Sequence, residues 1–189
     1  MVEQVDGRTV LLMDRFDRAG EARIPFLSAL SMLEAADGPH RSYMEIADAL
    51  RVHSASTSED LRELWRRVVF TVLVSNTDDH LRNHGFIYVG DQGWRLSPAY
   101  DLNPVPTDVR PRVLSTAIVE GDDRSASIEL AFLAAGHFGL EDAEAQEIAT
   151  EVATAVAQWR DVARGLGASR GECDRMATAF EHEDRRSLS

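Results

Sequence analysis

The sequence predicts a mainly α-helical fold with a small β component, an α+β arrangement. Apolar residues recur at helical spacing over most of the chain, a Val- and Leu-rich stretch near the N-terminus has strand composition, and one hairpin signature lies near the middle. The 189 residues, 44% of them hydrophobic, suit one domain or a little more. We therefore expect one lobe with a single core over residues 1–189.

The N-terminal part is predicted to contain a strand followed by a helix. Arg8–Asp14 (RTVLLMD) follows the turn pair Asp6-Gly7 and has the composition of a strand. A polar loop (RFDRAGEARIP) leads to a stretch beginning at Pro25 (PFLSALSMLEAA), whose apolar residues have helical spacing. The turn residues Asp37-Gly38-Pro39 would end this helix.

Two helices and a hairpin are predicted next. The first helix covers Tyr43–Arg51. The second begins at Ser58 with a capping pattern and becomes almost wholly apolar towards Asn76, which predicts a central, buried helix. Phe86–Val89 and Trp94–Leu96 flank the residues Gly-Asp-Gln-Gly, a pattern typical of a short hairpin.

The C-terminal part is predicted to be helical. The segment SPAYDLNPVP, which follows the hairpin, is punctuated by proline and is expected to be irregular. Glycines then separate the expected helices, which are Ser127–His137, Glu141–Arg164 and Arg170–Glu183, with breaks at Gly136, Gly139 and Gly165–Gly167. The order of elements is therefore strand, helices, loop, hairpin, loop, helices.

Composition excludes several classes of function. The net charge of -12 argues against direct nucleic-acid binding, which needs clustered cations. All 20 basic residues are arginine, so no catalytic lysine is available. The single cysteine, Cys173, fits a reducing cytoplasm, and we expect it to have no chemical role. The first residues, MVEQVDGRTV, are partly acidic and contain no long apolar run, so we expect no signal peptide. No apolar run is long enough to span a bilayer, so we expect a cytoplasmic protein that does not enter the membrane.

The stretch SNTDDHLRNHGF, residues 75–86, carries the most chemistry. Asp78 and Asn83 lie five residues apart before the hairpin, and Asp101 lies just after it. Because a hairpin folds the chain back on itself, these three side chains can converge on one point. Phosphoryl transfer needs such a trio: one carboxylate orients the attacking hydroxyl, while an amide and a second carboxylate hold Mg²⁺ against the phosphates.

Three motifs in this order resemble the HipA family, bacterial serine/threonine kinases that are the toxins of toxin–antitoxin pairs. They are VLLMDRFDR near the N-terminus, TDDHLRN after the apolar helix and SPAYDLNPVP after the hairpin. The resemblance runs from about Thr9 to the last helices. It implies the helical C-terminal lobe of a kinase, with a hinge strand and a short β-hairpin at the nucleotide edge.

The resemblance also implies a role for each motif residue, with ATP and Mg²⁺ as cofactors. Asp78 matches the catalytic base, and Asn83 and Asp101 match the metal ligands. The segment from His80 to Asn83 would line the phosphates, the hinge residues from Asp14 to Phe16 would pair with adenine, and Asp17 would approach the ribose. The implied nucleotide-binding residues are Asp14, Arg15, Phe16, Asp17, His80, Leu81, Arg82, Asn83, Tyr100 and Asp101.

Other residues near these motifs have ordinary explanations. We expect Asp79 to be a solvated neighbour of Asp78 and His84 to support the loop, while His40, His53, His137 and His182 are incidental. A zinc site formed by Asp78, His80 and His84 is an alternative, but Gly85 and the following strand make the helix that such a site needs less favourable. The tryptophans Trp65, Trp94 and Trp159 are expected in the core.

A kinase of this family has an N-terminal lobe that carries a glycine-rich loop and a lysine, and this chain contains neither. We therefore expect the chain alone to be inactive or feeble. It could be one half of a split kinase completed by a separate N-lobe polypeptide, a shortened remnant, or a non-catalytic nucleotide- or partner-binding module. The resemblance further implies a DNA-binding antitoxin as partner and a protein substrate, with aminoacyl-tRNA synthetases among the family's targets.

Overall fold

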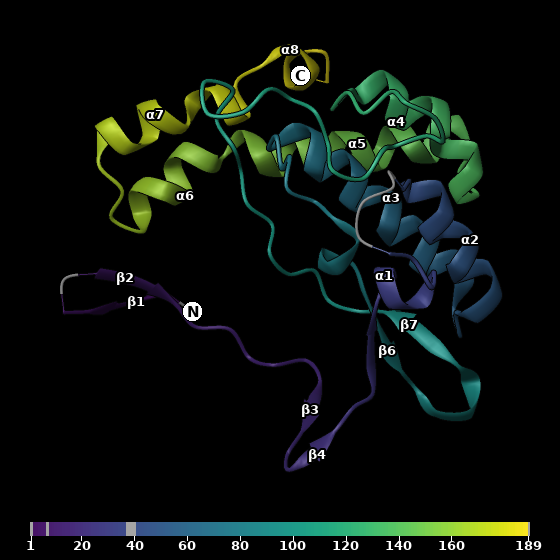
Figure 1. Ribbon diagram of the computed structural model, residues 1–189. Helices are drawn as coiled ribbons and strands as arrows, with labels where there is room; N and C mark the ends of the chain where they lie inside the picture. Colours follow the sequence, from purple (N-terminus) through teal and green to yellow (C-terminus); the bar gives the residue numbers. More distant parts are fainter. Residues whose placement is uncertain (1, 7, 37–40, 189) are drawn as a thin grey trace.

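Helix α3 (Thr57–Leu73) lies at the centre of the structure, a computed structural model that describes residues 2–6, 8–36 and 41–188 (Figure 1). Helices α2, α4 and α5 pack around it. The predicted buried helix is thus confirmed, although it begins at Thr57 and its N-cap residue, Ser56, makes no side-chain capping bond. The predicted helix at Tyr43–Arg51 is also confirmed as α2 (Tyr43–His53). Ser42 and Glu45 form a capping box at its N-terminus.

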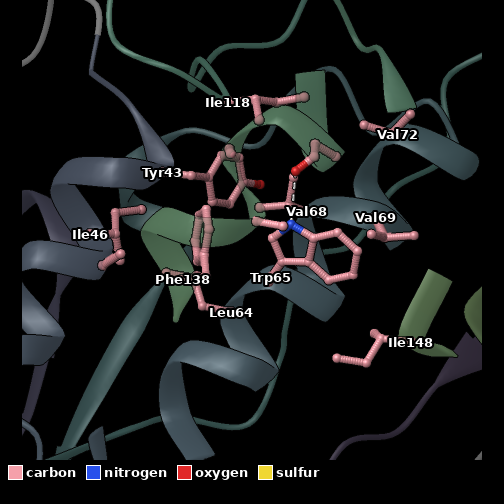
Figure 2. Close-up of a cluster of buried hydrophobic side chains, with 14 of the residues drawn as sticks. Tyr43, Ile46, Leu64, Trp65, Val68, Val69, Val72, Ile118, Phe138 and Ile148 are labelled. Carbon is pink, nitrogen blue, oxygen red and sulfur yellow. Dashed lines mark hydrogen bonds between the residues drawn. The ribbon is translucent and has the colours of Figure 1, made fainter. Parts of the chain in front are cut away.

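The core is formed by the apolar face of α3 and the helices around it (Figure 2). Trp65 is completely buried, and its indole Nε1–H donates to the carbonyl oxygen of Ala131 at 2.9 Å. Phe138 and Ile148, from the C-terminal half of the chain, belong to the same core, and Phe138 lies close to Tyr43 and Leu64 (Figure 2). The prediction of a core tryptophan is therefore confirmed for Trp65.

The N-terminal region contains more β structure than the sequence pattern indicated. Only Arg8–Leu11 of the predicted strand is a strand (β2), and it pairs with β1 (Val2–Val5), which the sequence analysis missed. The loop predicted to be irregular contains the two-residue strands β3 (Arg18–Ala19) and β4 (Ala22–Arg23). Figure 1 shows the β1–β2 hairpin lying apart from the helices.

The helix predicted from Pro25 is largely wrong. Phe26–Ser28 forms strand β5, and helix α1 covers only Ala29–Met32. The apolar pattern of this stretch fits either structure, and pairing with the distant strand β6 (Gly85–Tyr88) favours the strand. The predicted end of this helix at Asp37-Gly38-Pro39, and the incidental role of His40, lie outside the described residues.

The predicted hairpin is confirmed as β6 (Gly85–Tyr88) and β7 (Trp94–Leu96), joined by the short 3₁₀ turn η2 (Gly90–Gln92). With β5 at its other edge, β6 forms the middle of a three-stranded antiparallel sheet. This sheet carries the chain from the loop before β6 to the segment after β7, so it determines how close those two segments lie.

The C-terminal part is helical, as predicted, with different boundaries. The helix predicted over Glu141–Arg164 is interrupted at Gln158, after which Trp159 stacks on Phe180 at 4.4 Å. Before this helix, Gly139 ends a 3₁₀ turn and adopts the left-handed conformation, with φ of 73°. The elements are α4 (Ile128–Ala134), the 3₁₀ turn η3 (Ala135–Phe138), α5 (Asp142–Ala157), α6 (Trp159–Gly165), α7 (Arg170–Phe180) and α8 (Glu183–Arg186). Within the described residues, none of the helices has the length and apolar character needed to cross a membrane.

Candidate functional site: the loop after helix α3

The loop that carries Asp78 begins with a sharp turn at the end of α3. Ser75 has a φ of 53°, in the left-handed region that few residues other than glycine adopt. Its hydroxyl donates to the carbonyl oxygen of Ala179 at 3.0 Å, and its own carbonyl oxygen accepts from the N–H of Val105 at 3.1 Å. These contacts hold the strained turn in place and fix the direction in which the loop leaves the helix.

Asp78 and Asn83 are joined within the loop. The Asn83 amide nitrogen Nδ2 donates to the carbonyl oxygen of Asp78 at 3.0 Å, and Asn83 lies in the 3₁₀ turn η1 (Leu81–Asn83). This bond fixes the orientation of the amide, and the oxygen Oδ1, which carries the lone pairs, is the atom that can bind a cation. The Asp78 side chain is 56% exposed, and Arg110 approaches its Oδ1 at 3.5 Å. Asp78 is therefore the accessible carboxylate of the loop.

Tyr100 connects the loop to the segment that carries Asp101. Its hydroxyl donates to the carbonyl oxygen of Arg82 at 2.6 Å, and partial burial raises the pKa of Tyr100 to about 12, which keeps it a donor. Asp101 is exposed and has a φ of 55°, and its Oδ1 accepts from Asn103 Nδ2 at 2.7 Å. The strands β6 and β7 thus return the chain to the loop, as the hairpin predicted.

A pocket of about 360 Å³ lies beside this junction. Its walls include the predicted hinge residues from Asp14 to Phe16 and Asp17, the predicted ribose contact, together with Arg82 and Tyr100. Three aromatic rings gather there: Phe16 lies 5.8 Å from Phe26 and 5.7 Å from Tyr100, between ring centroids. A flat apolar ligand fits a wall of this kind.

Two lining residues of the pocket, Met13 and Phe26, were not predicted as site residues. Phe26 was missed because its stretch is predicted as a helix, whereas it forms strand β5, pairs with β6 and lines the pocket. Asp17 also lines the pocket and forms an ion pair with Arg15 at 2.6 Å. The hydrogen bond from Arg15 lowers the pKa of Asp17.

The expectation that Asp79 is a solvated residue without contacts is wrong. Asp79 is 1% exposed, and its Oδ2 accepts from the Tyr43 hydroxyl at 2.8 Å. Its Oδ1 accepts from the backbone N–H groups of Ser115 and Thr116 at 3.0 and 3.4 Å. Burial raises the pKa of Asp79 to about 6. No local pattern could have revealed these contacts, since every donor lies 36 or 37 residues away.

The predicted supporting role of His84 is confirmed. Its side chain is buried, its ring lies 4.9 Å from that of Tyr43, and its Nε2 lies 3.3 Å from the carbonyl oxygen of Asp79. Burial lowers the pKa of His84 to about 4, so the ring is neutral at physiological pH. Two histidines that were expected to be incidental do make contacts. His137 Nε2 lies 3.0 Å from Asp48 Oδ1, and His182 Nε2 lies 3.1 Å from the Leu73 carbonyl oxygen, so both residues help to join helices.

The predicted phosphate segment from His80 to Asn83 has mixed exposure. Leu81 packs in the hydrophobic core, Arg82 is exposed, and His80 is half-buried. The buried Nδ1 of His80 has no hydrogen-bond partner among the described residues. Only part of this segment can therefore face a ligand with its side chains.

The donor set suits magnesium better than zinc. Within the part of the chain that the structure describes, no three His, Cys, Asp or Glu side chains gather in a way that could hold a metal ion. His84, which the zinc alternative requires, is occupied with Tyr43 and Asp79. Asn83 and Asp101 offer oxygen atoms, and Mg²⁺ is commonly held by one or two protein oxygens while keeping several waters.

Comparison with known proteins defines the class of this fold. The structure superposes on the Shewanella oneidensis HipA of a toxin–antitoxin complex with HipB and operator DNA, with a TM-score of 0.73 and 18% identity, over 100% of this chain and 49% of that one. The fold is thus kinase-like and α+β. The sequence model described as "HipA-like C-terminal domain" matches residues 1–159, and the chain belongs to this family.

Curated relatives agree with this assignment. A Haemophilus influenzae protein named "Putative kinase" is 30% identical over 94 residues, which are 48% of this chain and 27% of the relative. The Sinorhizobium fredii protein "Putative kinase Y4dM" is 32% identical over 120 residues, 61% of this chain and 26% of the relative. The matched region thus spans about a quarter of these relatives.

Proposed function

We propose that the chain is the C-terminal lobe of a HipA-type protein serine/threonine kinase, which binds ATP with Mg²⁺ and transfers its γ-phosphate to a protein hydroxyl in the cytoplasm. The hydrogen bond from the Tyr100 hydroxyl to the Arg82 carbonyl oxygen carries this proposal. It joins the aromatic pocket to the loop of Asp78 and Asn83. Asp101 is the next residue after Tyr100, which supports a shared site for Asp101 and that loop. Adenine would lie in the pocket, with the phosphates extending towards the loop.

The loop residues suit the proposed chemistry. Asp78 is exposed, so it can orient a substrate hydroxyl and accept its proton. Asn83 and Asp101 would hold Mg²⁺, which supplies positive charge to the phosphates when it is bound. Asp14, Arg15, Phe16 and Asp17 would contact the base and ribose from the pocket wall.

The phosphate side requires groups that this chain does not carry. The chain has no lysine, and a kinase uses a glycine-rich loop and a lysine above the phosphates. We propose that another lobe, on the same or a separate polypeptide, supplies them. Val5, Leu11 and Met13, in and beside the N-terminal hairpin, are 49%, 63% and 58% exposed, and such apolar surface suits a contact with that lobe.

A regulatory partner follows from the same proposal. The Shewanella HipA was solved with HipB and operator DNA. We propose that a DNA-binding antitoxin also binds this protein, and that any contact with DNA is made by the antitoxin, because the chain itself carries a net charge of -12.

One observation favours a second function, a non-catalytic nucleotide-binding module. Arg110 approaches the Asp78 carboxylate at 3.5 Å and could compete with a substrate hydroxyl for this group. In such a module the pocket and the metal ligands would still bind Mg²⁺ and ATP, while phosphate transfer would be absent whichever partner is added.

Phosphotransfer measured with and without the glycine-rich lobe separates the two functions. For a kinase, activity should appear on mixing and should fall about 10²- to 10⁴-fold in Asp78→Asn, the usual contribution of a general base. Asp91→Asn, an exposed aspartate of the turn η2, is the matched control and should keep full activity. Absence of turnover in every mixture, with ATP still bound, would support the binding module instead.

Gly85→Ala tests the pocket. A methyl group at residue 85 would lie 2.3 Å from Phe26 Cε2, so the Phe26 ring must move out of the pocket wall. Losing one aromatic contact of about 0.5–1.5 kcal/mol should weaken ATP binding by about 2- to 10-fold. In Gly136→Ala the methyl group meets open space, and calorimetric titration should give the wild-type affinity. Unchanged affinity in both variants would place adenine elsewhere.

A further inference from the structure

Asp79 is the buried counterpart of the exposed Asp78. One of its carboxylate oxygens accepts from the Tyr43 hydroxyl of helix α2, and the other accepts from two backbone N–H groups at Ser115 and Thr116. One side chain therefore connects three parts of the fold: the loop after α3, the start of α2, and the segment before α4.

The backbone around Asp79 is held by the same segments. The Thr116 hydroxyl donates to the Asp79 carbonyl oxygen at 2.7 Å, and the Ser115 hydroxyl donates to the Thr77 carbonyl oxygen at 2.9 Å. With both its side chain and its peptide groups fixed, residue 79 cannot rotate independently. The neighbouring Asp78 carboxylate is therefore directed outward, and the Asp78 carbonyl oxygen is presented to Asn83.

This anchoring is costly. A carboxylate that is 1% exposed loses nearly all of its hydration, and an apolar residue of similar size would avoid that cost. Three donors within hydrogen-bond distance compensate for part of it. A group of this kind contributes more to fixing one geometry than to raising the stability of the fold.

We propose that Asp79 is a positioning residue that fixes the loop carrying Asp78 and Asn83 in the geometry needed for Mg²⁺ and ATP. This proposal rests on the proposed function, because it predicts that the affinity of the loop for Mg²⁺ with ATP depends on Asp79. It predicts also that the loop itself is loosened when this carboxylate is removed, whether or not nucleotide is present.

Asp60 provides a matched control at the other end of α3. It is 3% exposed, and its carboxylate accepts from Arg95 Nε at 3.0 Å, the Ser54 hydroxyl at 2.6 Å and the Leu96 N–H at 3.1 Å. Asp60→Ala and Asp79→Ala each remove a buried, fully bonded carboxylate. Both should lower the melting temperature, so stability alone does not distinguish them.

Hydrogen exchange and Mg²⁺-dependent ATP binding do distinguish them. Asp79→Ala should raise amide exchange at residues 77–84 and weaken binding of Mg²⁺ with ATP, each by about tenfold, because partners of the carboxylate are left unpaired. Asp60→Ala should leave both within about twofold of the wild type. Equal effects in the two variants, or wild-type values in Asp79→Ala, would overturn the proposal.

Asp79→Asn removes the negative charge of residue 79 but can keep the hydrogen bonds that hold the loop. Its Oδ1 can still accept from Ser115 and Thr116, and its Nδ2 can donate to the Tyr43 oxygen, whose hydroxyl would then donate to Thr71 Oγ1, 3.4 Å away. This variant should keep exchange near the wild-type level, and adding Tyr43→Phe should remove that rescue. Hydrogen exchange is measured without nucleotide, so it tests the role of Asp79 even if the wild type binds no Mg²⁺ with ATP. Absence of that binding in the wild type would contradict the proposed function and not the role of Asp79.

Discussion

Replacing His84 by glutamine is expected to make the protein lose about 3 kcal/mol of stability, relative to the wild type, as the pH rises from about 4 to 6.5. The cause is the loss of the His84 contribution, which in the wild type grows over this pH range and offsets the opposite contribution of the neighbouring Asp79. Glutamine retains an amide donor close to the position of Nε2, so the contact with the Asp79 carbonyl oxygen can persist.

The sign follows from two pKa changes in opposite directions. Burial raises the pKa of Asp79 from 3.8 to about 6, so its contribution to stability is complete below 3.8 and is lost as the pH rises through 6. Burial lowers the pKa of His84 from 6.5 to about 4, so its contribution is complete above 6.5 and is lost as the pH falls through 4. In the wild type the two contributions oppose each other between these limits.

Urea unfolding at several pH values measures this balance. Relative to the wild type, His84→Gln should lose stability with rising pH, and Asp79→Asn should gain about as much, on the order of 3 kcal/mol. If the free energy of unfolding of both variants instead runs parallel to that of the wild type between pH 4 and 6.5, burial does not shift the pKa values of Asp79 and His84 in opposite directions.

Replacing Asp101 by asparagine is expected to remove the Mg²⁺ dependence of ATP binding. Asn tolerates the left-handed conformation that residue 101 adopts, with φ of 55°, so this variant removes the charge with little change in backbone strain. Affinity for ATP in the presence of Mg²⁺ should fall at least about tenfold, because even residues that only support metal ligands change metal affinity 10- to 100-fold.

Two controls define that result. Asp101→Ala should lose at least as much affinity, since alanine loses the carboxylate and disfavours the left-handed conformation. Asp108→Ala, an exposed aspartate on the same segment, should bind ATP with Mg²⁺ as the wild type does. Similar losses at residues 101 and 108 would indicate a general effect of negative charge rather than a metal ligand.

The sequence predicted those parts of the fold that are determined locally. Helix α3 has a long apolar pattern, and the β6–β7 hairpin has a glycine-bounded turn, so both were predicted with small boundary errors. Strand β5 was missed because FLSALSML satisfies helical spacing, whereas its partner β6 lies about sixty residues away. Distant pairing overrides local preference in such stretches.

The candidate site divides in the same way. The sequence predicted that Asp78 and Asn83 lie in one loop, and the structure adds a hydrogen bond from the Asn83 amide to the Asp78 carbonyl oxygen that no pattern indicated. The hairpin predicted that the chain near Asp101 returns to the loop of Asn83, and the neighbouring residues Tyr100 and Arg82 are in contact. Asp79 was wrongly predicted to be solvated. Its hydrogen-bond partners come from two distant segments, and the sequence next to Asp79 contains no sign that its carboxylate is buried.

Paramagnetic line broadening by Mn²⁺ with ATP tests the central claim most directly, namely that the loop of Asp78 and Asn83, the segment of Asp101 and the aromatic pocket form one metal–nucleotide site. Amide signals of residues 78–83 and 100–102 should broaden first, the pocket residues 13–17 less, and helix α6 not at all. Strong broadening at α6 and α7 with sharp signals from the loop would contradict the account.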